Sequence, residues 1–331
     1  MSRTAILYFT DRGAQLGQML SKKLNCTAQK PPKGGLSALA EKLFHEVDTL
    51  IFIGACGIAV RAIAPHVVSK VSDPAVIVMD EKGEHVISLL SGHIGGANDL
   101  ARRIAGFIGG EAVVTTATDV NGRFSIDAWA ARHNCVIDSM ENEKEYAAAI
   151  LKRDLPLKTD FEIAGSLPSG VFLGDEGACG AVISVKKDED SFETTLRLIP
   201  RIIHIGIGCR RGTPKEKIAA AIDLALNECR IDRRAVKSVS SIDVKKDEEG
   251  LLEYCRENGL PVSFYSAQEL NEVEGEFPHS DYVFKTVGVG NVCDRAAVRS
   301  AGTDSEVLVS KIILDGVTAG VAQEKWRVSF E

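Results

Sequence analysis

Short apolar runs that suit buried strands alternate with helical patterns through the first part of this 331-residue chain. Alternation of this kind, with short loops, is typical of a mostly parallel sheet that carries helices on both faces. The strand-like runs are Ala5–Phe9, Thr49–Ile53, Ala75–Met79, His85–Leu90 and Ala112–Thr115. The helical patterns are Ala14–Leu24, Leu39–Val47, Ala97–Phe107 and Ile126–His133.

One turn breaks this alternation, because the strand-like runs on either side of it have no helix between them. It has the sequence Asp80-Glu81-Lys82-Gly83. A polar turn that ends in glycine between two apolar runs predicts a β-hairpin. One antiparallel pair would make this sheet mixed.

Three loops rich in small residues follow predicted strands of this unit. They are Gly54–Arg61, Ser91–Asp99 and Thr115–Asp119. Glycine lets the backbone come close to a ligand, and a helix N-terminus offers free N–H groups to an anion. We expect the three loops to converge on one crevice at the carboxyl ends of the sheet.

The pattern changes after Cys135. A short helix, Lys144–Arg153, is followed by strands that Gly, Pro and acidic residues punctuate, which predicts a small, irregular unit. Those strands are Phe161–Ile163, Gly170–Leu173, Ala181–Val185 and Thr194–Ile199. Alternation resumes near Arg201. The predicted fold is therefore two α/β units with mostly parallel sheets, 1–134 and 200–331, joined by a small irregular α+β middle unit, 135–199.

Composition narrows the possible functions. The formal net charge of -7 argues against a nucleic-acid partner, because phosphates reward surplus Lys and Arg, but it leaves an anionic small molecule open. No apolar run is long enough to span a bilayer. The eight cysteines include no C-x-x-C pair, so neither a zinc site nor a thioredoxin-like site is supported. A reducing cytoplasm is the expected compartment.

The loop Gly206–Gly212 opens the last unit with a Gly-Ile-Gly start. Arg211 stands where a dinucleotide fingerprint needs its third glycine, and no Gly-Lys-Ser/Thr follows, so both nucleotide-binding interpretations weaken. Two adjacent guanidiniums remain, Arg210 and Arg211, ahead of a helix that we expect to begin with Thr213 as N-cap and Pro214 next. Such a loop suits carboxylates. The alternative is a tight turn with two solvated arginines.

His93 lies in the glycine-rich segment Ser91–Gly96, where a substrate could approach it. An imidazole can give or take a proton near neutral pH, so His93 is a candidate acid or base, and a purely structural histidine is the alternative. Asn98 and Asp99 could cap the following helix or contact a ligand. Asp119 could be a general base or the cap of a turn.

Other polar residues have weaker claims. Arg61 could clamp a carboxylate. Lys70 could do the same, or could form a surface pair of little energetic weight with Asp73. Cys56 and Cys209 lie in glycine loops, so a thiol nucleophile is conceivable, but neither has an obvious histidine partner in the sequence.

Taken together, these segments resemble the cobalt-precorrin-5A hydrolase family of anaerobic cobalamin biosynthesis. The resemblance covers nearly the whole chain and is weakest between about 135 and 200. No single motif is specific, but all of them in this order are. They are Gly57-Ile58-Ala59-Val60-Arg61, Lys70 with Asp73-Pro74-Ala75-Val76, Leu89-Leu90-Ser91-Gly92-His93, Gly95-Gly96-Ala97-Asn98, Thr115-Thr116-Ala117-Thr118-Asp119 and Gly206-Ile207-Gly208-Cys209-Arg210-Arg211-Gly212.

The resemblance implies a large anionic substrate, a cobalt-containing tetrapyrrole-like macrocycle with acetate and propionate arms. Water would open a δ-lactone on this macrocycle, and the methylated bridge carbon would leave as acetaldehyde, which contracts the ring. The cobalt belongs to the substrate, so the protein would need no metal and no cofactor of its own. The C-terminal unit alone would also suit a non-catalytic carrier of tetrapyrrole intermediates, which is the alternative function. Other cobalamin-pathway enzymes and a second copy of the chain are conceivable partners.

Residue roles follow from matching that chemistry. His93 would transfer protons, and Asp99 or Asp119 would orient its imidazole. Backbone N–H groups near Gly95 and Gly96 could stabilise an oxyanion. The expected substrate-binding residues are Gly57, Arg61, Lys70, Ser91, Gly95, Gly96, Asn98, Gly208, Cys209, Arg210 and Arg211.

Overall fold

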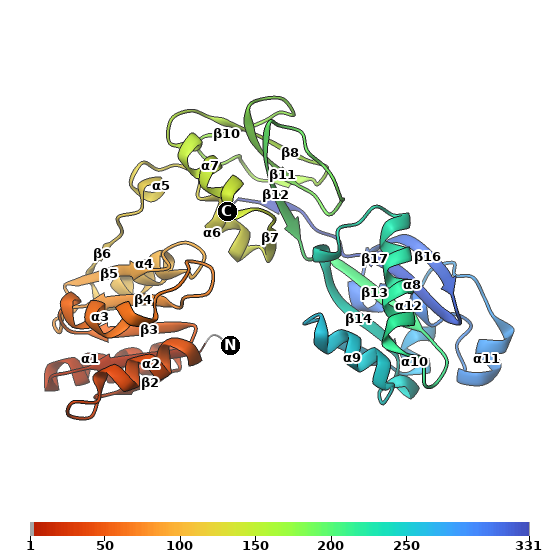
Figure 1. Ribbon diagram of the computed structural model, residues 1–331, viewed down its shortest axis with the longest axis horizontal. Helices are drawn as coiled ribbons and strands as arrows, with labels where there is room; N and C mark the ends of the chain where they lie inside the picture. The colour runs from red at the N-terminus through yellow and green to blue at the C-terminus, as the bar shows by residue number, and fades with distance from the viewer. Residues whose placement is uncertain (1–2, 331) are drawn as a thin grey trace. The chain divides into compact units, whose positions relative to one another are not determined.

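The computed structural model describes residues 3–330, which divide into two compact units (Figure 1). The first unit contains the chain up to His133 together with Ala147–Asp154 and Pro168–Gly170, and the second contains the rest. Both units are mixed α/β structures, which confirms the predicted fold class. The finer division into three domains stays a prediction.

The first unit is built on a six-stranded sheet with the order β2-β1-β3-β4-β5-β6. Strands β1 to β4 are mutually parallel, β5 runs antiparallel to β4, and β6 runs parallel to β5. The predicted hairpin and the mixed sheet are both confirmed. The strands are β1 (Thr4–Tyr8), β2 (Thr27–Gln29), β3 (Thr49–Ile53), β4 (Ala75–Met79), β5 (His85–Leu90) and β6 (Glu111–Val113).

Helices cover both faces of this sheet, as the uniformly buried strand β3 requires. On one face α2 and α3 pack through Phe44 and Ala59 against Phe52. On the other, α1 and α4 pack through Leu20 and Ile104. The helices of this part are α1 (Asp11–Leu24), α2 (Leu36–Glu46), α3 (Cys56–Ile63), η1 (Ala64–His66), α4 (Ala97–Ile108), α5 (Ala117–Val120) and α6 (Ile126–Arg132).

The hairpin decides where the loops of the first unit emerge. Leu90, at the end of β5, pairs with Val76 near the start of β4. Gly54, after β3, instead donates its backbone N–H to Met79 at the end of β4. The chain therefore leaves β5 and β6 at one end of the strands, and it leaves β1 and β3 at the opposite end. We call these two sets of strand ends the two edges of the sheet. A strand of five residues separates these edges by about 16 Å.

The second unit contains a five-stranded sheet with the order β10-β8-β11-β12-β7, parallel except for β7. The expected strand Phe161–Ile163 is wrong, because the chain forms instead a two-residue strand that pairs with the C-terminal strand β18. These elements are β7 (Cys135–Ile137), α7 (Met140–Ile150), β8 (Leu155–Thr159), β9 (Ile163–Ala164), β10 (Val171–Leu173), β11 (Cys179–Ile183), β12 (Thr194–Pro200) and β18 (Val328–Ser329).

A second five-stranded sheet in this unit has the order β15-β14-β13-β17-β16, in which β13, β14 and β15 are parallel. Its core includes Ile205, Ile207 and Ile222. The elements are β13 (Ile203–Gly208), α8 (Lys215–Glu228), η2 (Arg233–Ala235), β14 (Val236–Ile242), η3 (Asp243–Lys245), α9 (Glu249–Glu257), β15 (Val262–Tyr265), α10 (Ala267–Asn271), α11 (Asp281–Val287), α12 (Cys293–Ala301), β16 (Glu306–Leu314) and β17 (Val317–Gln323).

Candidate functional site

The imidazole of His93 lies between two carboxylates in the first unit. Its Nε2 is 2.8 Å from Oδ2 of Asp119, and its Nδ1 is 3.2 Å from Oδ2 of Asp127. His93 comes from the loop after β5, Asp119 from α5 and Asp127 from α6. The hydroxyl of Thr118 is also 3.3 Å from Nε2. Three separate segments therefore meet at one imidazole.

Both carboxylates are held by further donors. Asp119 accepts hydrogen bonds from Thr116 at 2.6 Å, from Asn98 at 3.0 Å and from Arg102 at 2.5 Å. Asp127 accepts one from Ser125 at 2.8 Å and one from the backbone N–H of Ala128 at 2.9 Å. Each carboxylate oxygen of the pair thus accepts at least one hydrogen bond, and these donors stabilise the ionised form, which makes both aspartates weak bases.

The electrostatics favour a charged imidazolium. Burial lowers the pKa of His93, but the hydrogen bonds and charges of Asp127 and Asp119 outweigh it, so the pKa is raised above its usual range. Burial acts to raise the pKa of Asp119, but Thr116, Arg102 and His93 hold this pKa far below its usual range. The pKa of Asp127 is lowered for the same kind of reason. In this state His93 is a proton donor at both ring nitrogens.

The loop that carries His93 is shaped by small residues. Ser91 has a left-handed backbone with φ 54°, and Gly96 has φ 79° at the N-cap of α4. A Cβ on Gly95 would lie 2.5 Å from the Cβ of Ser91, a distance that real side chains do not tolerate. The close turn therefore requires glycine at 95, and it places the backbone of the loop against the start of β4.

The segment that contains Lys70 lies at this same edge. Asp73 is 7% exposed, and it accepts backbone hydrogen bonds from Val68 and Ser69, which closes the loop before β4. The hydroxyl of Ser91 donates to the backbone carbonyl of Asp73 at 3.0 Å. The structure thus brings together the loops of several residues predicted from the sequence: His93, Asp119, Lys70, Ser91, Gly95, Gly96 and Asn98.

Other predicted residues of the first unit lie elsewhere. Asp99 does not touch His93, because its half-exposed carboxylate pairs with Arg102 at 3.3 Å. Gly57 and Arg61 belong to α3, which starts at the opposite edge of the sheet. The expected convergence of all three loops is therefore wrong, and the antiparallel pairing of β4 with β5 is the reason.

The loop Gly208–Arg211 belongs to the second unit, where it follows β13. The backbone N–H groups of Gly212 and Thr213, just before α8, both donate to the carboxylate of Glu248. These two donors are therefore already occupied and do not need an anionic ligand. The helix α8 begins later than expected, with Pro214 as N-cap, and the hydroxyl of Thr213 donates to the carbonyl of Arg210. The expected N-cap at Thr213 is therefore wrong.

The two adjacent arginines of this loop differ. Arg211 pairs with Asp247 at 2.9 Å and donates to the carbonyl of Val244. Within residues 3–330 the guanidinium of Arg210 has neither a hydrogen bond nor an ion pair, so it is available to a ligand. Burial raises the pKa of the Cys209 thiol between Gly208 and Arg210, which disfavours a reactive thiolate there.

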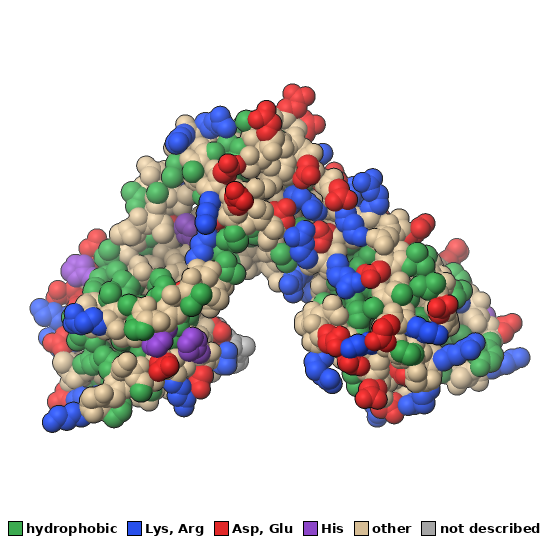
Figure 2. Space-filling model, viewed as in Figure 1, with side chains coloured by type: hydrophobic (Ala, Val, Ile, Leu, Met, Phe, Trp, Pro, Cys, Tyr) green, Lys and Arg blue, Asp and Glu red, His purple; other side chains and the backbone are tan. Residues whose placement is uncertain are grey.

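Charged side chains of both signs are interspersed on the visible face of the second unit rather than gathered in one patch (Figure 2). In the part of the chain that the structure describes, no group of three or more His, Cys, Asp or Glu side chains is arranged to hold a metal ion. No helix among residues 3–330 combines the length and the apolarity that crossing a membrane requires.

Asp127 was not among the site residues predicted from the sequence. The residue stands two positions after Ser125 at the start of α6, where an aspartate is most simply explained as part of a helix start. Only the orientation of α6 against the loop after β5 turns this carboxylate toward His93. The one signal in the sequence was a carboxylate within the apolar helical pattern Ile126–His133, and the structure shows that this residue is 6% exposed.

Comparisons with known proteins agree along most of the chain. The family model described as Cobalamin synthesis G N-terminal matches residues 38–119, and the model Cobalamin synthesis G C-terminus matches residues 203–322. A Cobalt-precorrin-5A hydrolase of Salmonella typhimurium is 38% identical over 290 residues, 84% of this chain and 83% of its own. A Cobalt-precorrin-5A hydrolase of Priestia megaterium is 35% identical over 297 residues, 84% of this chain and 79% of its own.

The solved structure of CobE, a protein from the cobalamin (vitamin B12) biosynthetic pathway, matches a smaller part. It is 28% identical, covers 38% of this chain and 92% of its own, and has a TM-score of 0.36. A structural likeness this low carries no argument about the present chain.

Proposed function

The chain belongs to the cobalamin synthesis G family, and on this basis we propose that it acts as a cobalt-precorrin-5A hydrolase. The observation that carries the proposal is the identity to named hydrolases across most of both chains. The cluster around His93 lies partly within the matched N-terminal family region and supplies acid–base groups that such a reaction needs.

The reaction requires proton transfers at two steps. When water adds to the lactone carbonyl and the acyl–oxygen bond breaks, the departing alkoxide on the bridge carbon must gain a proton. That hydroxyl then loses its proton as the carbon–carbon bond breaks, acetaldehyde leaves, and the bonding electron pair passes to the macrocycle. One residue that alternates between acid and base can serve both steps.

His93 is our candidate for this residue. As an imidazolium it donates a proton to the departing alkoxide, and as the neutral imidazole that results it accepts the proton of the bridge hydroxyl. Its side chain is 17% exposed, so a substrate can reach it only over a small area. We assign the proton exchange with the substrate to Nε2 of His93. When Nε2 leaves Asp119 to contact the substrate, three other donors still hold the Asp119 carboxylate in place.

The aspartates act as positioning residues. Asp127 fixes the ring through Nδ1 and stabilises the charged form, in the way that a buried carboxylate orients a catalytic histidine elsewhere. Asp119 holds Nε2 between turnovers. Asp99 pairs with Arg102, which in turn holds Asp119, so the role that we propose for Asp99 is to orient this arginine.

The substrate carboxylates need cations and backbone donors. In the first unit we propose Lys70, Ser91, Gly95, Gly96 and Asn98 as contacts, because their loops surround His93. In the second unit we propose Arg210 with Gly208 and Cys209. Arg211 contributes positive charge while it remains paired with Asp247. We further propose that cobalt arrives with the substrate and that the protein holds no cofactor.

The decisive experiment is turnover. Purified protein is incubated anaerobically with the lactone-bearing cobalt precursor, and the volatile aldehyde is trapped and quantified. Release by the wild-type chain supports the hydrolase, and folded protein that binds the precursor without releasing aldehyde supports a carrier instead. The His93→Ala variant separates the two further, because the hydrolase loses release while a carrier would lose only binding.

We also propose where and with what the enzyme works. A biosynthetic step on a labile intermediate suits the cytoplasm and handover from other enzymes of the cobalamin pathway. A homodimer is compatible with this proposal, and sedimentation analysis of the purified chain tests it.

A further inference from the structure

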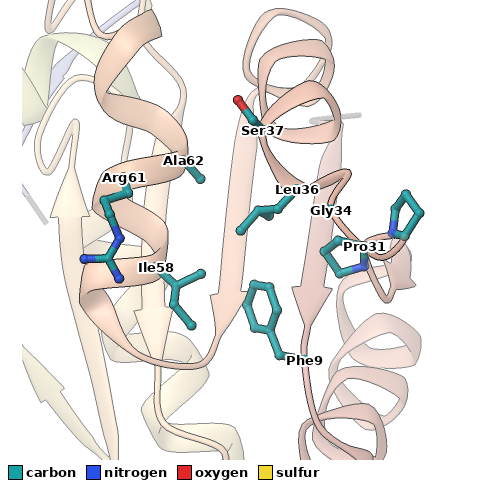
Figure 3. A pocket seen from close by; sticks show the side chains of 9 residues that line it. Phe9, Pro31, Gly34, Leu36, Ser37, Ile58, Arg61 and Ala62 are labelled. Carbon is teal, nitrogen blue, oxygen red and sulfur yellow. The ribbon is translucent and has the colours of Figure 1, made fainter.

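A pocket of about 510 Å³ opens in the first unit, away from the cluster around His93 (Figure 3). It lies where β1 and β3 end and where the chain enters α2 and α3. The residues that line it include Phe9, Pro31, Leu36, Ile58, Arg61 and Ala62.

The position of the pocket follows from the strand order. From β1 the chain winds to β2 on one side, and β3 lies on the other side of β1. Crevices of this kind, at the carboxyl ends of strands where the winding changes direction, are the usual ligand sites of open α/β sheets. Because β5 is reversed, His93 lies at the other edge, and the pocket is therefore separate from the proposed reaction site.

The walls of the pocket are apolar. Phe9, Leu36 and Ile58 face one another across it in Figure 3. The absence of a side chain at Gly54 makes room for the ring of Phe9, because a Cβ there would lie 2.8 Å from Cδ2 of Phe9. The glycine that the sequence offered as a point of close ligand approach instead positions an aromatic wall.

Arg61 is the only charged residue among those that line the pocket. Its guanidinium folds back over the first turn of α3, where a Cβ on Gly57 would lie 3.4 Å from Nη1, and in Figure 3 it points away from Phe9 and Leu36. A rotation about the side-chain torsions of this exposed residue would bring it to the rim of the pocket. Within residues 3–330 its guanidinium has no hydrogen bond and no ion pair. The α2 and α3 helices both begin nearby without a side-chain cap, at Gly35 and Ala55. The rim therefore favours an anion.

We propose that this pocket is a second binding site, for a five-membered heterocyclic ring that carries a carboxylate arm. The ring lies against Phe9 and Ile58, and the carboxylate binds Arg61 at the rim. The volume admits one ring with its arms and is too small for a whole macrocycle that carries such arms. The choice of a pyrrole-type ring rests on the proposed function, since the substrate and the product both present such rings with acetate and propionate arms.

The test uses a single pyrrole that carries one acetate and one propionate arm, titrated into the full chain by calorimetry. Saturable binding to the wild-type protein is expected, and it should weaken at least tenfold in Arg61→Met. The dimethyl ester of the same pyrrole, which lacks the charge, should bind at least tenfold more weakly than the diacid. Arg103→Met is the matched control, because Arg103 is an exposed arginine on α4, and it should bind as the wild type does.

A second variant tests the apolar wall. Ile58→Trp fills the pocket and keeps Arg61, so it should also abolish binding, and thermal unfolding checks that each variant is folded. No saturable binding to the wild-type chain, equal binding by Arg61→Met, or equal binding of the diester overturns the proposal. Aldehyde release is measured on the same samples. If the wild-type chain releases aldehyde normally but does not bind the pyrrole, only the proposal of this second site is wrong. If it binds the pyrrole but releases no aldehyde, only the proposed hydrolase function is wrong.

Discussion

Asp127 accepts a hydrogen bond from Nδ1 of His93 at 3.2 Å, although 34 residues of sequence separate the two. This contact, together with that of Asp119 on the other ring nitrogen, favours the charged form of the imidazole and fixes its orientation. The arrangement explains how one residue could give a proton first and take one later. It also defines which substitutions should change the pH dependence of the reaction rather than the fold.

Asp127→Asn should move the pH profile of aldehyde release. The carboxylate raises the pKa of His93, so its loss lowers that pKa, and the imidazolium needed to protonate the alkoxide disappears at a lower pH. The alkaline limb of kcat against pH should shift toward acid. An unchanged limb, in a variant that remains folded, would remove Asp127 from the proton-transfer assembly.

His93→Ala should lower kcat by roughly 10²–10⁴-fold, the usual contribution of a positioned acid–base group. His133→Ala serves as a control, because His133 stacks on Trp129 with ring centroids 4.6 Å apart and has no proposed contact with the substrate. Single-turnover aldehyde release measures the effect. If both variants lose the same activity, general destabilisation explains the result better than chemistry does.

The charged cluster should make stability depend on pH. The raised pKa of His93 gives a stabilisation that is complete below the ordinary histidine value of about 6.5 and is lost as pH rises through the folded value. The lowered pKa values of Asp119 and Asp127 give a stabilisation that is present above about 3.9 and is lost in stronger acid. The difference in unfolding free energy between wild type and His93→Gln should therefore be largest between these limits and shrink at alkaline pH. Urea titrations at several pH values measure it, and a constant difference would contradict the assignment.

Arg210→Ala and Arg211→Ala should behave differently although the residues are adjacent. Arg210 has no partner in the described chain, so its loss should weaken substrate binding by about 1.5–3 kcal/mol, the worth of a charged hydrogen bond, without changing stability. Arg211 forms an exposed ion pair with Asp247, and because water screens such a pair its loss should leave stability almost unchanged. KM and urea unfolding are measured for both variants. Equal KM effects would show that the exposed pair opens for the substrate.

Gly95→Ala and Gly106→Ala should have opposite effects on stability. A Cβ on Gly95 would collide with Ser91, so overpacking should destabilise the chain by about 1–3 kcal/mol and disturb the loop that carries His93. Gly106 lies inside α4 with no atom within 4 Å of an added Cβ, so alanine should stabilise the helix by about 0.5–1 kcal/mol. Thermal unfolding of both variants decides whether the glycine at 95 is structurally required.

Much of the secondary structure was predictable because strands and helices have different periods. The predicted run Thr49–Ile53 has the same bounds as strand β3. The hairpin turn lies at Asp80–Gly83, where polar residues and a glycine predicted it. Strand β2 was missed because three residues, Thr27–Gln29, are too few to show alternation. The start of α8 was placed one residue early, because Thr213 satisfies a carbonyl rather than capping the helix.

By itself the sequence determined most of the elements, the hairpin and the family, since these depend on residue types and their spacing along the chain. Only the tertiary structure decided which loops meet. The direction of a strand depends on the partner beside it, and the reversal of β5 carried the loop of His93 to one edge of the sheet and left Arg61 at the other. In the same way, Asp127 became a partner of His93 only through the packing of α6, because contacts between distant segments depend on how helices and strands are oriented and not on local pattern.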